Sequence, residues 1–135
     1  MATSHRNSTT ADRPMSSWVR VAPDSRYLAL FAVGSAFAFA HTLDEIRIGQ
    51  FIAVPFALAN ALALGALPRV GRGWRAALAI AFGLLWFVTV VPYHVLPLLH
   101  GVVSWQNLSG LSRIAGGLIL IATGIGSVAR RQGQN

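Results

Sequence analysis

The stretch 27-YLALFAVGSAFAFAHTLDEIRIG-49 decides the fold of this chain, because an uncharged apolar run leads directly into a charged turn. The run 27–40 has no charged residue, whereas four of the next seven residues are ionisable: His41, Asp44, Glu45 and Arg47. With its flanking residues, such a run reaches the roughly 17–25 residues that one bilayer crossing requires. We therefore predict a membrane-spanning helix whose last turns hold the charges.

The composition of the whole chain agrees with a membrane protein. Hydrophobic residues make up 54% of the 135 residues and charged residues only 11%, against about 25% charged residues in soluble domains. Three further apolar windows follow, so we predict an all-α, four-helix transmembrane bundle (residues 26–129) with spans at about 27–48, 51–67, 74–91 and 111–129. The absence of cysteine excludes disulfides, thiolate metal sites and a cysteine nucleophile.

Local signals place the ends of these helices. Asp24 or Ser25 suits a helix N-cap, and Gly49 suits the residue after a helix because glycine tolerates positive φ. Pro92 is expected to stop the third helix, which leaves 92–110 as an interfacial or re-entrant segment between the third and fourth helices. Residues 1–25 and 130–135 are polar and are predicted to be tails, the first of them disordered. A signal peptide is the alternative for 28–40, with cleavage after 38-AFA-40.

The arginines predict the orientation. Nine arginines fall on the side of the membrane that is predicted to hold both termini and the loop 68–75. Two arginines, Arg47 and Arg113, fall on the opposite side. The positive-inside rule then places both termini in the cytoplasm and the protein in the inner (cytoplasmic) membrane. Because the arginines bracket apolar spans, we read the net charge of +7 as a topology signal and expect no nucleic-acid partner.

Small residues predict how the helices pack. In a bilayer, helices associate through close backbone approach and polar contacts, which small side chains permit. The second window places four small residues at intervals of four: Ala53, Ala57, Ala61 and Gly65. This stripe is expected to pack within the chain or against a second copy.

The charged turn supplies the candidate site. His41 and Glu45 are spaced i, i+4 and share one helix face with Gly34 and Ala38, while Asp44 can pair with Arg47 at i+3. Ionisable groups within a membrane cost free energy and usually have a function. The alternative is structural: Glu45 and His41 hydrogen-bond each other at a helix end and have no further role.

Two later histidines, His94 and His100, are expected on the same side of the membrane. With His41, Asp44 and Glu45 they would form a nitrogen and oxygen site suited to zinc, iron or copper, and a histidine pair could instead hold a haem. Proton exchange between His41 and Glu45 in a small proton-coupled transporter is a further alternative.

The motif 41-HTLDE-45 resembles the signature of the HXXEE family, small multi-span bacterial membrane domains of unknown function. Asp44 stands where that family has Glu, and Pro97 precedes His100-Gly101 where the family has a His followed by a Pro-Gly step. The resemblance implies that His41 and the acidic pair matter, without implying a reaction.

No reaction follows from these patterns. The predicted function is a binding or accessory subunit of the membrane that holds a cofactor or stabilises a partner membrane protein or a second copy of itself. A metal- or haem-binding enzyme or redox protein that uses His41, Glu45 and His94 or His100 is the main alternative.

Overall fold

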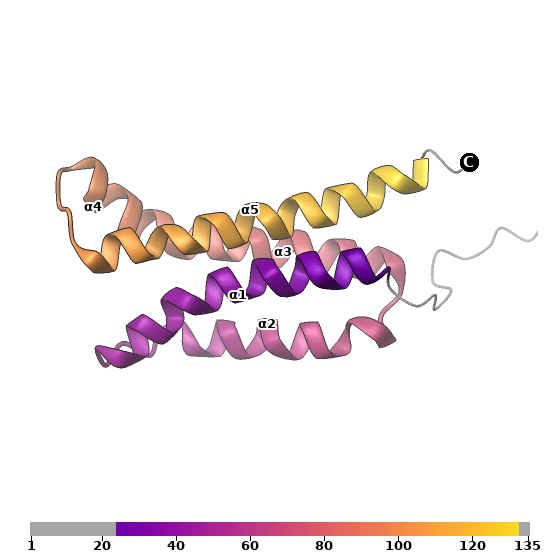
Figure 1. Cartoon of the computed structure of the whole chain (residues 1–135), viewed down its shortest axis with the longest axis horizontal. Coiled ribbons are helices and arrows are strands. Elements are labelled where there is room, and N and C mark those ends of the chain that lie inside the picture. The colour runs from indigo at the N-terminus through magenta and orange to yellow at the C-terminus, as the bar shows by residue number, and fades with distance from the viewer. Residues whose placement is uncertain (1–23, 133–135) are drawn as a thin grey trace, which may run out of the picture.

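The computed structural model describes residues 24–132, with side chains up to residue 130. Residues 1–23 of the predicted disordered tail 1–25 lie outside this range, and its last two residues cap and begin the first helix. The described residues form helices and no strand. Four helices run antiparallel in chain order: α1 (Ser25–Arg47), α2 (Val54–Ala66), α3 (Arg72–Val90) and α5 (Trp105–Gln132). Both ends of the described chain therefore lie at one end of the bundle, and the short helix α4 (Leu96–Leu99) lies at the other (Figure 1). The predicted all-α bundle is confirmed.

Local sequence sets both ends of α1 as predicted. The Asp24 side chain caps the helix by accepting a hydrogen bond from the backbone N–H of Arg26 at 3.1 Å. The helix ends at Arg47, and Gly49 adopts φ of +80°, a conformation that costs glycine little. The chain then turns back tightly into α2.

Within residues 24–132, three helical segments are long and apolar enough to cross a membrane: Ser25–Arg47, Arg72–Leu99 and Trp105–Arg130. Helix α2 has 13 residues, about 20 Å of rise, and it continues into a single 3₁₀ turn, η1 (Leu67–Arg69). The predicted second span 51–67 is therefore shorter than expected, because the helix starts only at Val54 and Pro68 tightens its last turn.

The expected break at Pro92 is wrong. The helix α3 passes directly into a π-helical turn, η2 (Val91–Val95), and then into α4, so that residues 72–99 form one continuous helical segment. Proline lacks an N–H and its ring crowds the preceding turn, and a π-helical turn is a single-turn widening of a helix. The connecting loop is short, 100–104, and α5 starts at Trp105, six residues earlier than predicted. The predicted segment 92–110 between the third and fourth helices is therefore mostly helical, and its non-helical part is 100–104.

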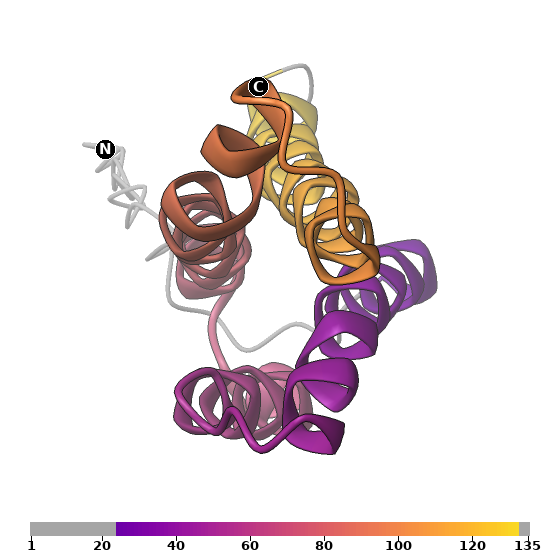
Figure 2. The ribbon, with the colours of Figure 1, turned by 90° about the vertical axis from the view of Figure 1, so that its left-hand side faces the viewer.

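Helix α5 is the centre of the packing. It runs alongside both α1 and α3, whereas α2 packs mainly on α1 (Figure 2). At two crossings the backbones approach closely through glycine. A Cβ on Gly34 would lie 3.0 Å from the carbonyl oxygen of Gly116, and a Cβ on Gly83 would lie 2.7 Å from that of Gly117. Around these crossings lies the core: Tyr27, Phe31, Ala38, Leu67, Ala79, Trp86 and Leu120.

The small-residue stripe of α2 packs only in part. Ala53 is buried and Ala57 packs against the core, but Ala61 and Gly65 are exposed, and a Cβ on Gly65 would meet nothing within 4 Å. The prediction of internal packing is wrong for these last two residues, because the buried face of α2 continues through Asn60, Leu64 and Leu67 instead of following a strict four-residue spacing. Packing of this half against a second copy stays a prediction.

One buried polar contact joins α2 to α1. The Ser35 hydroxyl donates to Oδ1 of Asn60 at 3.0 Å, and Nδ2 of Asn60 has no acceptor among the described residues. Replacing Ser35 with alanine would leave the Asn60 amide wholly unpaired, so we expect the free energy of unfolding in detergent to fall by about 0.6–1.7 kcal/mol, the measured range for such interhelical bonds. Ser127→Ala is the control, because that hydroxyl bonds only within its own helix, to the carbonyl of Gly124. Equal losses in the two variants would contradict the interhelical role.

Candidate metal centre

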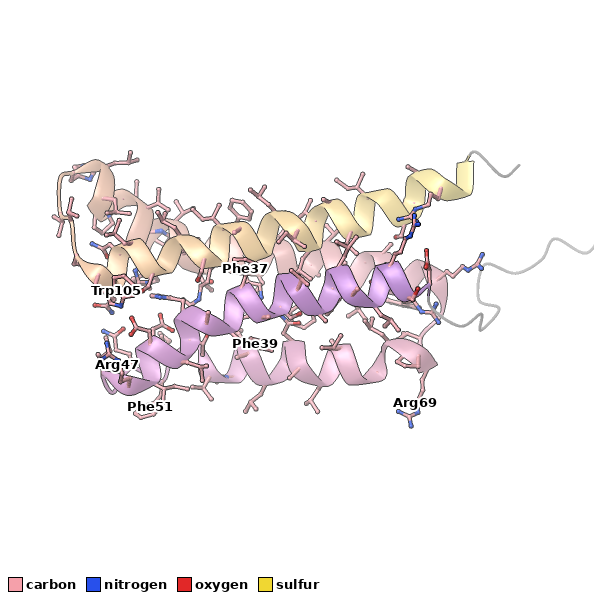
Figure 3. The ribbon with its side chains drawn as sticks, in the orientation of Figure 1. Phe37, Phe39, Arg47, Phe51, Arg69 and Trp105 are labelled. Atoms are coloured by element: carbon pink, nitrogen blue, oxygen red, sulfur yellow. The ribbon has the colours of Figure 1, made fainter. Side chains whose placement is uncertain are left out.

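Three of the five predicted site residues meet at the α4 end of the bundle. His41 and Glu45 lie one turn apart on the buried face of α1, with Gly34 and Ala38 on the same face, and His94 reaches them from η2. All three side chains are at most 5% exposed. Figure 3 shows Arg47 and Trp105 at this end and Arg69 at the opposite end. The buried group of His41, Glu45 and His94 is the candidate metal centre.

The other two predicted residues lie outside the candidate metal centre. Asp44 forms an ion pair with Arg47, whose terminal nitrogen lies 3.0 Å from a carboxylate oxygen, and this pair is at the surface. His100 is exposed and its Nδ1 hydrogen-bonds the carbonyl of Leu96 in its own helix at 2.7 Å. His100 is therefore removed from the predicted ligand set, because the continuation of α3 through Pro92 carries it beyond the cluster.

The three candidate ligand atoms fit one ion. His41 Nε2 lies 3.0 Å from His94 Nε2, while Glu45 Oε1 lies 3.4 Å from the first and 3.8 Å from the second. A triangle with these three sides has a circumradius of about 2.0 Å, so one point lies at that distance from all three atoms. Bonds from zinc to imidazole nitrogen and carboxylate oxygen have this length, about 2.0–2.2 Å. The three distances are therefore compatible with one metal ion in contact with all three atoms.

Asn107 fixes the protonation pattern of His94. The Asn107 amide nitrogen donates to the carbonyl of Val102 at 2.9 Å, so its oxygen faces Nδ1 of His94, at 3.4 Å. An amide oxygen only accepts, so Nδ1 of His94 holds the proton. In the neutral ring, Nε2 of His94 then has no proton, and its lone pair faces the candidate metal centre.

Ser109 fixes the protonation pattern of His41. Its hydroxyl lies 3.2 Å from Oδ2 of Asp44 and 3.1 Å from the carbonyl of Gln106, and both of these atoms only accept. The single hydroxyl proton goes to one of them, so Ser109 accepts a hydrogen bond from Nδ1–H of His41, at 2.9 Å. The Nε2 lone pair of His41 therefore also points at the cluster, with Asp44 as an indirect partner of the ring.

Arg113 holds the Glu45 carboxylate in place. Its guanidinium donates through NH1 to Oε1 at 3.0 Å and through NH2 to Oε2, and NH2 also donates to the Thr42 hydroxyl at 3.1 Å. The guanidinium also lies over the Trp86 ring, 5.3 Å from its centroid. Oε1 keeps a second lone pair for another partner. The carboxylate is thus oriented by one cation and is free to bind a second.

Gly110 makes room for His94. A Cβ at this position of α5 would lie 2.6 Å from Cγ of the imidazole and 2.8 Å from its Cβ. The ring therefore lies directly against the α5 backbone, nearly perpendicular to the ring of His41 (interplanar angle 86°, centroids 4.4 Å apart). The π-helical turn brings His94 to this position while its neighbour Tyr93 is exposed.

This arrangement does not fit a haem between the histidines. Two axial imidazoles on opposite sides of one iron need nitrogens about 4 Å apart, twice a metal–nitrogen bond, with the macrocycle between them. The two Nε2 atoms are 3.0 Å apart and the rings are in edge contact. A single ion bound at adjacent coordination positions is the arrangement that fits.

A cavity of about 830 Å³ adjoins the candidate metal centre. Glu45, His94, Asn107 and Arg113 form part of its wall, and the remainder comes from the turn before α2, the start of α2, the end of α3, η2 and Gln106 on α5. The cavity gives the cluster an open side, which is the arrangement of metal sites that exchange ligands rather than of closed structural sites.

Sequence reasoning missed Asn107, Ser109 and Arg113, all of them on α5. We counted Arg113 as a loop charge that reports orientation, whereas it lies about 12 Å inside the helix and is 2% exposed. The available signal was its position within an apolar run, since an arginine at membrane depth requires a carboxylate partner. Ser109, Arg113 and Gly116 also follow i, i+4, i+7 spacing, which predicts one buried face.

Comparison of the chain with protein-family models, with curated proteins and with solved structures finds no match. The resemblance of 41-HTLDE-45 to the HXXEE signature therefore stays a prediction. The chemistry of the site must be argued from its own geometry.

Proposed function

We propose that this protein is a small integral membrane protein that binds one transition-metal ion between His41, Glu45 and His94. The observation that carries the proposal is the convergence of two imidazole lone pairs and a carboxylate oxygen on one point, with both ring tautomers fixed by Ser109 and Asn107. The two Nε2 atoms are only 3.0 Å apart, so a cation lies between them: a proton shared in an N–H···N hydrogen bond or, in this proposal, a metal ion. Such hydrogen bonds to the outer ring nitrogen are typical of metal-ligating histidines.

The ligand set restricts the metal. Two imidazoles and one carboxylate suit zinc and iron(II), and they do not suit calcium or magnesium, which prefer oxygen ligands. One or more coordination positions stay open toward the adjoining cavity. The proposed role is to present this ion to a ligand or partner at the membrane, in keeping with a cofactor-holding membrane subunit.

The topology belongs to the same proposal. Three helical segments have the length to cross the bilayer, and we propose that α2 with η1 is a fourth, short crossing, since it returns the chain to the end where α1 begins (Figure 1). The arginine distribution then places both termini and η1 in the cytoplasm and the candidate metal centre near the outer face of the inner membrane.

Metal content tests the function directly. Detergent-purified protein, loaded with zinc or iron(II) and desalted, is expected to retain about one ion per chain, because three ligands and a fixed geometry bind far more tightly than a surface histidine. His94→Ala removes one ligand and should reduce the retained metal to background. His100→Ala is the matched control and should retain it, since His100 is exposed and bonded within its own helix. Elemental analysis of the three proteins is the measurement.

A second variant separates metal binding from a purely structural cluster. Asn107→Leu leaves all three ligands in place but frees the His94 tautomer, so we expect metal affinity to fall by about 10–100-fold, the usual effect of removing such a partner. Metal should also raise the melting temperature of the unmodified protein and leave that of His94→Ala unchanged. Retention of no ion by the unmodified protein, or equal retention by His94→Ala, would refute the proposed function.

A further inference from the structure

The cavity beside the candidate metal centre has two chemically different ends. Its polar end is formed by the metal centre itself, through Glu45 and His94, with Arg113 and Asn107 beside them. Its apolar end is formed by Ile52 in the turn before α2, Phe56 on α2 and Val88 on α3. Its volume of about 830 Å³ lies within the range of sites for small organic ligands, about 300–1,000 Å³. A ligand that fills it needs one polar and one apolar end.

The apolar end of the cavity is open. Ile52 is 72% exposed and Val88 71% exposed, although both are part of the cavity wall. Ile52 lies in the turn before α2 and Val88 lies on α3, and the two helices make little contact with each other. At the α4 end, Gln106 donates to Gln50 at 3.0 Å and bridges α5 to the loop before α2. The cavity is therefore open on its side, between the turn before α2 and helix α3.

The polar end calls for an anion once the metal is bound. Glu45 is the single carboxylate among the three ligands, and the charge of Arg113 already balances it. A divalent ion held by two neutral imidazoles would then leave the buried site with a net positive charge, which is costly unless an anion pairs with it. In addition, Nε–H of Arg113 is buried and has no acceptor among the described residues.

We infer that the cavity binds an amphiphile of the bilayer, with an anionic oxygen head group on the metal and beside Arg113, and its hydrocarbon chain between α2 and α3. The inference rests on the proposed function, because the metal supplies the main partner of the head group. It names the ligand class that the open side of the metal centre would take: a molecule with a carboxylate or phosphate head and at least one alkyl chain.

Photocrosslinking tests this inference. The full-length, metal-loaded protein is reconstituted in phosphatidylcholine vesicles with a fatty acid that has a diazirine at mid-chain, then irradiated and mapped by peptide mass spectrometry. We expect adducts concentrated at residues 52–56 and 88–93, which form the apolar end. Val88→Trp should block the opening and lower these adducts about tenfold, the change that about 1.4 kcal/mol produces. Leu84→Trp is the control, one turn earlier on the same exposed face of α3.

The outcomes separate the cavity from the metal. Adducts that spread evenly over the lipid-facing residues, or that respond equally to Val88→Trp and Leu84→Trp, would overturn the inference. Removal of the metal with a chelator should lower cavity labelling, while Val88→Trp should still retain one ion per chain, because it touches no ligand. Cavity labelling in a protein that retains no metal would support the amphiphile site and count against the proposed metal.

Discussion

Replacing Arg113 with methionine is expected to lower the free energy of unfolding by about 3–5 kcal/mol, because it leaves the buried Glu45 carboxylate without its cation. The guanidinium is 2% exposed and makes three hydrogen bonds across the α1–α5 interface, two of them to Glu45. Methionine fills a similar volume, so the loss reports the charge rather than a void. Chemical denaturation in detergent, followed by circular dichroism, measures it.

Two further variants isolate the ion pair. Arg47→Met removes the exposed cation that pairs with Asp44. The Arg47 side chain is 70% exposed, so this variant should lower the free energy of unfolding by at most about 1 kcal/mol. The double variant Glu45→Gln with Arg113→Met removes both buried charges and should recover part of the loss, which gives a coupling energy for the pair. Equal losses in Arg113→Met and Arg47→Met would contradict a charged, buried Glu45.

The ion pair explains Glu45 but not the histidines. A buried carboxylate held by an arginine needs no metal, and this is the structural interpretation that the sequence left open. The 3.0 Å contact between the two Nε2 atoms requires a proton or a metal ion between them, since each outer nitrogen is already bound by an acceptor on α5. The metal proposal therefore depends on His41 and His94, and loss of metal in His94→Ala tests the part of the site that Arg113 leaves unexplained.

Proton-coupled transport stays a prediction with little structural support. The polar side chains in the middle of the bundle, Ser35 and Asn60, bond to each other, and Glu45 is tied to Arg113 near the α4 end. Among the described residues, no continuous series of polar groups leads from the candidate metal centre toward the other end of the bundle. The cavity opens between the turn before α2 and helix α3 instead.

The sequence predicted the parts of the fold that depend on local signals. Asp24 as cap, Gly49 after the first helix and the shared face of Gly34, His41 and Glu45 all follow from residues within a few turns of one another. Pro92 misled because a helix can absorb a proline through a π-helical turn when a neighbouring helix holds both sides of it, and that support comes from α5, which lies later in the chain. The shortness of α2 was equally hidden, because apolar residues before Val54 form a turn rather than a helix.

The site was predictable only on the α1 side. The i, i+4 spacing of His41 and Glu45 identified two ligands, and a common membrane side suggested His94. The partners of these side chains are 53 to 68 residues away in sequence, a separation over which helical periodicity carries no information. Arg113 was assigned to the water because charge counting treats each arginine as exposed, and only a three-dimensional contact distinguishes a buried arginine from a topology signal.

Replacing Gly116 with valine is expected to separate α1 from α5 and to have the second large effect, about 3 kcal/mol or more on the free energy of unfolding. A Cβ at this position would lie 2.5 Å from the carbonyl oxygen of Gly34 and 2.9 Å from the backbone nitrogen of Ala38. Both obstacles are backbone atoms of a helix, so no side-chain rotation relieves the clash. Because the Arg113 contacts to Thr42 and Glu45 lie next to this crossing, metal retention should fall together with stability.

Gly126→Val on the same helix is the matched control, because it makes the same change in helix propensity where a new Cβ meets nothing within 4 Å. Valine is a better helix former than glycine, so this control should be neutral or slightly stabilising and should retain its metal. The difference between the two variants measures the α1–α5 contact alone. Equal stabilities and equal metal content in the two variants would show that α1 does not approach α5 closely. The candidate metal centre would then lose its geometric basis, because it needs the ligands of α1 to be held against α5.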